Sequence, residues 1–184
     1  MSPPASVGGD AKTRLFLALQ LPGDAVERLV AWQRELPVGA FRLVPPANLH
    51  VTLAFLGSRP AGEVPAICGA LREAAAAARR PLLRVSRYRE TRSVGMLALD
   101  DEEGRAAALA ADLAGRLERL GVYRAEARSW LAHVTVVRFR VPPRLAAAPP
   151  DLGEVSPSDA AVYSSVLRSD GAQYAVLESV ALGG

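Results

Sequence analysis

The 184-residue chain has a single cysteine, Cys68, and only two histidines, His50 and His133. One cysteine excludes an internal disulfide and any zinc site built from several cysteines. Cys68 lies in an alanine-rich apolar stretch, which favours a buried structural thiol over a nucleophile, because a reactive thiol needs an electropositive and partly exposed setting. With so few histidines, the place of each one is informative.

Other absences exclude further classes of protein. The chain has no uncharged apolar run long enough to cross a bilayer, and its first residues lack the basic and apolar regions of a signal peptide. It also has no G-x-G-x-x-G after the first strand-like run and no P-loop, so the familiar cradles for dinucleotides and triphosphates are missing. We expect a cytoplasmic protein that does not contact membranes and needs no cofactor.

Composition and charge fit one globular domain. Half of the residues (50%) are hydrophobic, which is enough to bury a sizeable core in a chain of this length. The net charge is +3, and Lys12 is the only lysine among 22 basic residues. This mild arginine excess is compatible with a polyanionic ligand such as RNA, but it is weak support for one. We expect residues 1–12 to be a disordered tail and residues 13–184 to form one bilobal, monomeric domain.

Apolar patterning predicts strands and helices in both halves of the chain. Asp24 is expected to cap the first helix, and Gly121 to end the third. Two β-rich halves that each contribute helices indicate an α+β fold with internal pseudo-symmetry. The predicted strands are 14–21, 41–44, 48–57, 82–88, 94–99, 130–139, 159–167 and 173–181, and the predicted helices are 24–36, 63–78 and 100–120.

An acidic run from Asp100 to Glu103 invites a metal-site interpretation. It opens a predicted helix whose last turn carries Arg116 and Arg119. Acids at the start and bases at the end match the helix dipole, and the run lacks the spacing of a calcium loop. We therefore interpret these acids as helix capping.

Two segments share a histidine followed two residues later by a threonine: NLHVTLAFLG at 48–57 and WLAHVTVVRF at 130–139. The pairs are His50 with Thr52 and His133 with Thr135, 83 residues apart. Side chains alternate faces along a strand, so each segment presents an imidazole and a hydroxyl on one face. The repetition predicts one shared site with a half contributed by each strand.

Two imidazoles in one cleft are suited to divided acid and base work, because histidine titrates near pH 6.5. The hydroxyls of Thr52 and Thr135 are short neutral donors that suit the non-bridging oxygens of a phosphate. Arg138 is the best-placed cation, although its odd spacing from His133 puts it on the opposite face of a regular strand. A strand end or a β-bulge is needed to turn it back.

Other chemistries fit these residues less well. A hydrolytic metal site usually has three protein ligands, and no carboxylate lies within six residues of either histidine in the sequence. There is no G-x-S-x-G, and nothing places a carboxylate behind a histidine as a serine triad requires. Metal-free phosphoryl transfer by two histidines remains.

These motifs resemble the 2H phosphoesterase superfamily, and within it the bacterial and archaeal RNA 2′,3′-cyclic phosphodiesterases once described as 2′-5′ RNA ligases. The resemblance covers about residues 14–182 and rests on RLFLALQLP at 14–22, VPPANLHVTLAFLG at 44–57 and HVTVVR at 133–138. It implies a two-lobed α+β fold in which pseudo-symmetric, mostly antiparallel sheets face a central cleft, with helices outside. It also implies metal-independent hydrolysis of RNA 2′,3′-cyclic phosphate ends, or small cyclic nucleotides, to 2′-phosphomonoesters.

The same resemblance implies a role for each site residue. His50 would be the general acid on the departing 3′ oxygen, and His133 the base that activates water. Thr52 and Thr135 would hold the phosphate, with Arg138 as an additional contact. Candidates to stack on a terminal base are Trp130, which lies three residues before His133, together with Phe41, Tyr163, Phe55 and Tyr88.

Two alternatives stay open at the level of sequence. A non-catalytic binder of RNA ends or nucleotides would keep the cleft without turnover, although it would not need two titrating groups. A 2′-5′ RNA ligase runs the reverse chemistry and would share every residue, so only identification of the product separates it.

Overall fold

The computed structural model describes residues 11–169 and 171–183. Residues 1–10 of the predicted tail lie outside this range. Lys12, the last residue of that predicted tail, instead belongs to strand β1 and pairs with Pro60. Among the described residues, no helix is long and apolar enough to cross a membrane.

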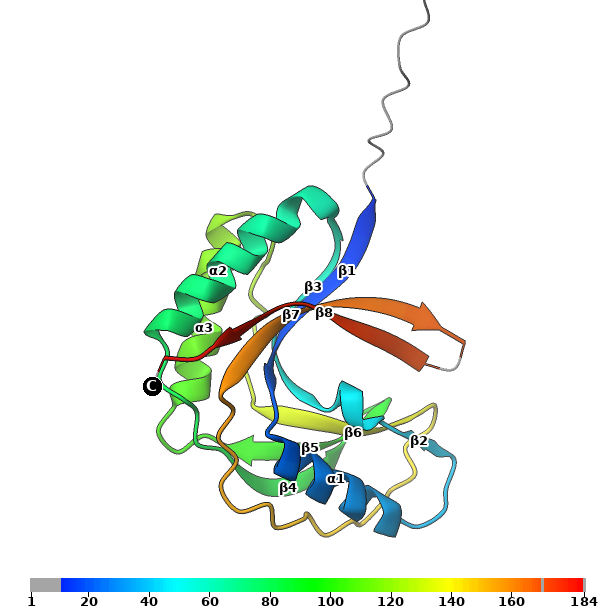
Figure 1. Cartoon of the computed structure of the whole chain (residues 1–184). Coiled ribbons are helices and arrows are strands. Elements are labelled where there is room, and N and C mark those ends of the chain that lie inside the picture. The colour runs from blue at the N-terminus through cyan, green and yellow to red at the C-terminus, as the bar shows by residue number, and fades with distance from the viewer. Residues whose placement is uncertain (1–10, 170, 184) are drawn as a thin grey trace, which may run out of the picture.

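The described part of the chain forms eight strands and three α-helices (Figure 1). Strands and helices occur in the predicted order, with boundaries that differ by a few residues. The strands are β1 Lys12–Gln20, β2 Phe41–Leu43, β3 His50–Pro60, β4 Arg84–Glu90, β5 Val94–Asp100, β6 His133–Phe139, β7 Asp159–Arg168 and β8 Gly171–Ala181. The α-helices are α1 Gly23–Glu35, α2 Val64–Ala77 and α3 Arg105–Arg119, and the 3₁₀-helices are η1 Pro46–Asn48 and η2 Ala61–Glu63.

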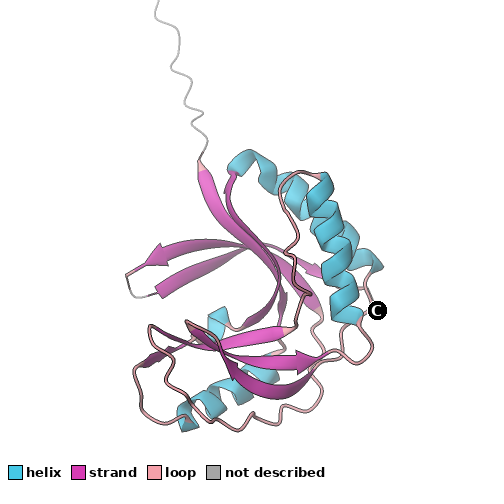
Figure 2. Ribbon diagram, turned by 180° about the vertical axis from the view of Figure 1, so that it is seen from behind, coloured by secondary structure: helices cyan, strands magenta, loops and turns pink. Residues whose placement is uncertain are grey.

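All strands belong to one antiparallel sheet with the order β4-β5-β6-β3-β1-β7-β8, and β2 pairs with β6. The two halves of the predicted fold are joined into one continuous curled sheet. The halves join where β3 meets β6, through the single pair Val51 and Val134. The α+β class, the antiparallel strands and the outer position of the helices are confirmed (Figures 1 and 2).

The core lies between the sheet and the outer helices. In β1, Leu15, Leu17 and Leu19 are fully buried against the helical side. On the other face of β1, Phe16 joins a separate small cluster with Tyr163. A strand covered on both faces reads as a continuous apolar run, and the sequence of β1 shows such a run.

Helix α1 is anchored by a buried amide. The Nε2 group of Gln33, only 3% exposed, donates to the carbonyls of Val44 at 3.1 Å and Val136 at 2.7 Å. A buried amide without partners is costly, so these two bonds fix α1 against the half of the sheet that contains β6.

The predicted helix starts differ in detail from the structure. Helix α1 begins at Gly23 after Pro22, so Asp24 lies in the first turn and faces Arg28 at 3.5 Å instead of capping. Helix α3 begins at Arg105, after the acidic run and not within it. One member of that run still serves the helix end, because Asp101 Oδ2 accepts a bond from the Ala107 backbone N–H at 2.8 Å.

Candidate active site

The two histidine strands, β3 and β6, begin at His50 and His133 and pair with each other where the halves of the sheet join. Val51 and Val134 are direct partners in an antiparallel pair, and they are 0% and 2% exposed on the core side. Directly opposite residues point to the same face of a sheet, and their neighbours point to the other. The flanking residues therefore emerge together on the face away from the core: His50, Thr52, His133 and Thr135.

All four of these side chains line one cavity of about 450 Å³. The cavity is lined by residues of the β3/β6 junction and of the β7–β8 hairpin. In Figure 1 this hairpin projects above β6 and β2. Its other lining residues come from both halves of the sheet: Arg14, Phe16, Arg42, Val44, Asn48, Phe55, Arg138, Ser165, Leu167, Arg168, Gly171, Ala172 and Tyr174.

Each imidazole is oriented by backbone two residues earlier. The Nδ1–H of His133 donates to the Leu131 carbonyl at 2.9 Å. The ring of His50 bonds the backbone of Asn48, while its Nε2 lies 3.1 Å from Thr52 Oγ1. With Nδ1 used by the backbone, the Thr52 hydroxyl donates to Nε2 in the neutral ring. Both rings are thus held so that Nε2 serves the cavity.

The environment of His50 favours its neutral form. Phe16 stacks on its ring with centroids 4.9 Å apart, and Tyr174 meets it edge-on at 5.6 Å. Burial lowers the pKa of His50 to about 4; the Asn48 backbone bond opposes this shift, and the charges of His133 and Arg138 add to it. Without a bound anion, His50 is therefore neutral at pH 7.

A bulge in β6 brings Arg138 to the histidine face. Arg138 pairs with Val94, Val137 with Gly95, and Thr135 with Met96, so Val136 has no partner on β5. Val136 and Val137 are both fully buried, which resets the alternation by one residue. Arg138 therefore lines the cavity, as the sequence interpretation required of a phosphate contact.

The electrostatics of the cavity are one-sided. Arg14, Arg42, Arg138 and Arg168 line it together with the two histidines, and no aspartate or glutamate is found among the described lining residues. Arg14 lies 4.7 Å above the ring of Phe55, which holds its guanidinium over an aromatic face. Such a site suits an anion bearing an apolar group. Within the described range, no three His, Cys, Asp or Glu side chains are grouped to hold a metal ion.

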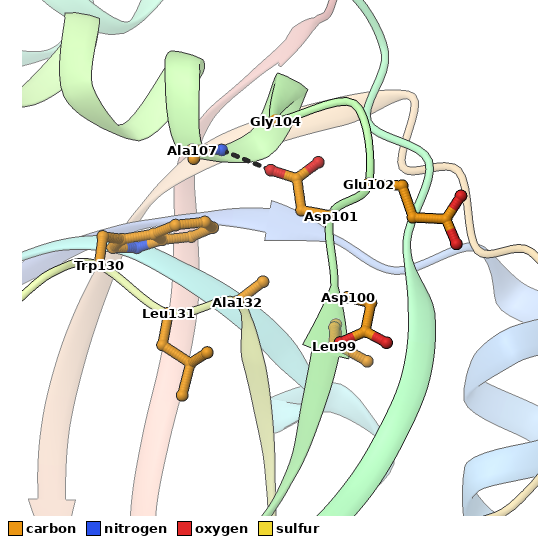
Figure 3. Close-up of a pocket in the computed structure, with 9 residues that line it drawn as sticks. All are labelled: Leu99, Asp100, Asp101, Glu102, Gly104, Ala107, Trp130, Leu131 and Ala132. Atoms are coloured by element: carbon orange, nitrogen blue, oxygen red, sulfur yellow. Dashed lines mark hydrogen bonds between the residues drawn. The ribbon is translucent and has the colours of Figure 1, made fainter.

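Among the aromatic candidates from the sequence, Phe55 lines the cavity, whereas the other four are not among the described lining residues. Tyr163 is 7% exposed and stacked flat on Phe16 at 4.8 Å, so it lies beneath the cavity. Phe41 is not among the residues lining the cavity in the described structure. Trp130 faces a separate depression beside Asp101 (Figure 3), and its Nε1–H donates to the Thr52 carbonyl at 3.1 Å. Trp130 thus braces the backbone of Thr52 from outside the cavity.

Sequence reasoning missed the aromatic residues Phe16 and Tyr174, and it did not single out Arg14, Arg42 or Arg168. Phe16 reaches the site because Ala18 pairs with Thr52 and therefore shares its face, as does the residue two positions earlier. The placement of Phe16 in the site depends on the register between β1 and β3, two strands that are separated in the sequence by a helix. No local pattern supplies that register.

The curled antiparallel sheet with outer helices is the fold of the 2H phosphoesterases, and the site lies at its central junction. A family model described as LigT like Phosphoesterase matches residues 19–94. The structure of TT0787 from Thermus thermophilus has a TM-score of 0.78 and 31% identity, covering 93% of this chain and 98% of that one. The chain therefore belongs to the LigT-like phosphoesterase family.

Two further relatives have informative names. E. coli LigT, whose structure was determined in complex with 3′-AMP, has a TM-score of 0.80 and 24% identity, covering 95% of this chain and 100% of that chain. A Thermus thermophilus protein named RNA 2′,3′-cyclic phosphodiesterase is 45% identical over 53 residues. That match spans 28% of this chain and 27% of the relative.

Proposed function

We propose that this protein hydrolyses the 2′,3′-cyclic phosphate at RNA ends, and in small cyclic nucleotides, to a 2′-phosphomonoester without a metal ion. The observation that carries the proposal is the set of two histidines and two threonines on one face of the β3/β6 junction, within an arginine-lined cavity. Donors of this kind fit a phosphate, and paired imidazoles fit the proton transfers of its hydrolysis. The name of the Thermus relative agrees with this substrate class.

In the proposed reaction, His133 Nε2 accepts a proton from a water molecule as the water oxygen attacks phosphorus. The bond from phosphorus to the 3′ oxygen breaks, and the His50 imidazolium gives its proton to that oxygen. One water is consumed, and the products are a 2′-phosphate and a free 3′-hydroxyl. Thr52, Thr135 and Arg138 hold the non-bridging oxygens, whose negative charge grows in the transition state.

For His50 to act as an acid, it must become protonated when the substrate binds. In the free site the pKa of His50 is about 4, so the ring is neutral at pH 7. A cyclic phosphate brings a negative charge beside His50 and offsets the repulsion from His133 and Arg138, which raises the pKa. The electrostatics of the free site alone keep His50 neutral, which suits a base and not an acid. A substrate whose leaving group needs no proton separates the two assignments.

The test is incubation of the full chain with 2′,3′-cyclic AMP in excess EDTA, followed by identification of the product. We expect adenosine 2′-phosphate, formed at a rate that chelation does not change. Activity lost in EDTA and restored by one divalent metal would contradict the metal-free mechanism. Tight binding of the cyclic nucleotide with no turnover would indicate a nucleotide-binding protein instead of an enzyme.

A further inference from the structure

A second cavity adjoins the histidine cavity. It measures about 480 Å³, and the two cavities share walls formed by Arg42, Arg138 and Tyr174. Between them, the Asn48 Nδ2–H donates to the Ala172 carbonyl at 2.9 Å and links η1 to the β7–β8 hairpin. Each cavity lies in the size range of about 300–1,000 Å³ typical of small-ligand sites. A ligand that fills the first therefore has a neighbouring site of similar volume.

The second cavity has its own chemical character. The lining that it does not share with the first cavity consists of Leu43, Pro45 and Ala47 on one side and Gln173 on the hairpin. Apolar side chains offer a nonpolar surface against which a base can be buried, and an amide offers both a donor and an acceptor for its edge. Leu43 is 43% exposed, so its side chain is accessible to a ligand.

The boundary between the cavities carries paired positive charge. Arg42 of β2 and Arg138 of β6 are direct partners across an antiparallel ladder, and both line both cavities. Both guanidinium groups line the boundary, and guanidinium groups are suited to binding the oxygens of a phosphate. A phosphodiester group is an anion that is also covalently attached to a nucleoside on each side.

We infer that the second cavity holds the nucleoside that precedes the cyclic phosphate terminus, so that the preferred substrate is an oligonucleotide end. This inference rests on the proposed function. It places the nucleotide on the 5′ side of the cyclic phosphate end in the second cavity. The cyclic phosphate lies at the histidines, the preceding phosphodiester lies beside Arg42 and Arg138, and the next base contacts Leu43. A mononucleotide fills only the first cavity.

The experiment compares kcat/KM for 2′,3′-cyclic AMP with that for the dinucleotide ApA ending in a 2′,3′-cyclic phosphate. The wild-type chain should prefer the dinucleotide by about 5-fold or more, which is the low end of the worth of a base stacked on an aromatic side chain. Leu43→Glu places a carboxylate in the second cavity, so the preference should fall to about twofold or less. Ala47→Glu enters the same cavity from η1 and should act in the same direction.

The matched control is Leu120→Glu, because Leu120 is 45% exposed and lies at the end of α3. It should leave the preference at the wild-type value, and circular dichroism verifies the fold of all three variants. A wild-type preference near one, with cyclic AMP hydrolysed, would overturn this inference alone. So would a preference that survives both cavity variants, or one that is lost only in Arg14→Ala, since Arg14 lines the first cavity and not the second. Failure to hydrolyse cyclic AMP would remove the proposed function and this inference together.

Discussion

His50 is the residue on which the electrostatics of the site converge. Its ring is packed between Phe16 and Tyr174 and faces the charges of His133 and Arg138. Packing of this kind holds an imidazole in place, but it also penalises the charged form that a proton donor needs. The binding of a phosphate and the protonation of His50 are therefore coupled, and each should favour the other.

This environment predicts a pH dependence of stability. The folded pKa of about 4 lies below the unfolded value of 6.5, so the unfolded chain binds the proton more readily. The stabilisation is fully present above pH 6.5 and is lost as the pH falls through about 4; its full size is about 3 kcal/mol. Urea unfolding from pH 7 to pH 4 should show a loss of this order, and His50→Gln should show a smaller one. Equal losses in both proteins would contradict the assigned environment.

Arg138 offers a second test at the residue scale. Arg138→Ala should raise KM and lower kcat, with a loss in kcat/KM of about 10²–10³, because the guanidinium binds the phosphate and stabilises its added charge. Arg140→Ala is the matched control, since Arg140 is exposed and does not line the cavity. Equal kinetics for Arg138→Ala and the wild-type chain would exclude a phosphate contact.

Residue placement was predictable from sequence only where it followed from local spacing. The pairs His50 with Thr52 and His133 with Thr135 share a face because two-residue spacing decides it. Tyr174 could not be found in this way, because its place depends on how the β7–β8 hairpin lies over the site. Trp130 was placed by its distance from His133, but it precedes the first residue of β6, so the alternation of a strand does not extend to it.

At the scale of elements, the β6 bulge and the β7–β8 hairpin shape the cavity. The bulge turns Arg138 toward the histidines, and the hairpin contributes six of the lining residues: Ser165, Leu167, Arg168, Gly171, Ala172 and Tyr174. The sequence predicted both strands of the hairpin from their apolar runs. The β6 bulge was not predicted at a particular residue, because bulges leave no reliable local pattern in a sequence. The sequence indicated only that a strand end or a bulge must turn Arg138 toward the histidines.

The bond between Asn48 and the Ala172 carbonyl should fix the hairpin over the cavity. Asn48→Ala should cost about 1 kcal/mol of stability and increase amide hydrogen exchange in the hairpin around residues 171–174. Ser86→Ala is the control, because Ser86 also bonds a backbone carbonyl, that of Ala98, away from the hairpin. Hairpin exchange that is the same in Asn48→Ala as in the wild-type chain would show that the bond does not hold it.

At the scale of the whole molecule, the two halves meet at the antiparallel pair of Val51 and Val134, the central residues of the two His-Val-Thr motifs. The sequence predicted pseudo-symmetry from the repeated motif, and the structure adds how the halves join. The environments of the two imidazoles are nevertheless different, because His50 is packed on Phe16 and bonded by Thr52. The two equivalent motifs thus hold their imidazoles in different environments, as the proposed division into acid and base requires.

The measurement that tests this division of roles most directly uses two substrates and two variants. The first substrate is 2′,3′-cyclic AMP, whose 3′ oxygen needs a proton to leave. The second is 3′-deoxyadenosine 2′-(4-nitrophenyl phosphate), whose nitrophenolate leaves without a proton and whose sugar has no neighbouring 3′-hydroxyl to attack the phosphate. On cyclic AMP, His50→Ala and His133→Ala should each lose about 10²–10⁴ in rate.

On the nitrophenyl substrate, His50→Ala should recover most of the wild-type rate, because no acid is needed. His133→Ala should stay impaired, because water still requires a base. Recovery by His133→Ala instead would reverse the two roles, in line with the neutral form of His50 in the free site. Full activity of either variant on cyclic AMP would contradict two-histidine catalysis altogether.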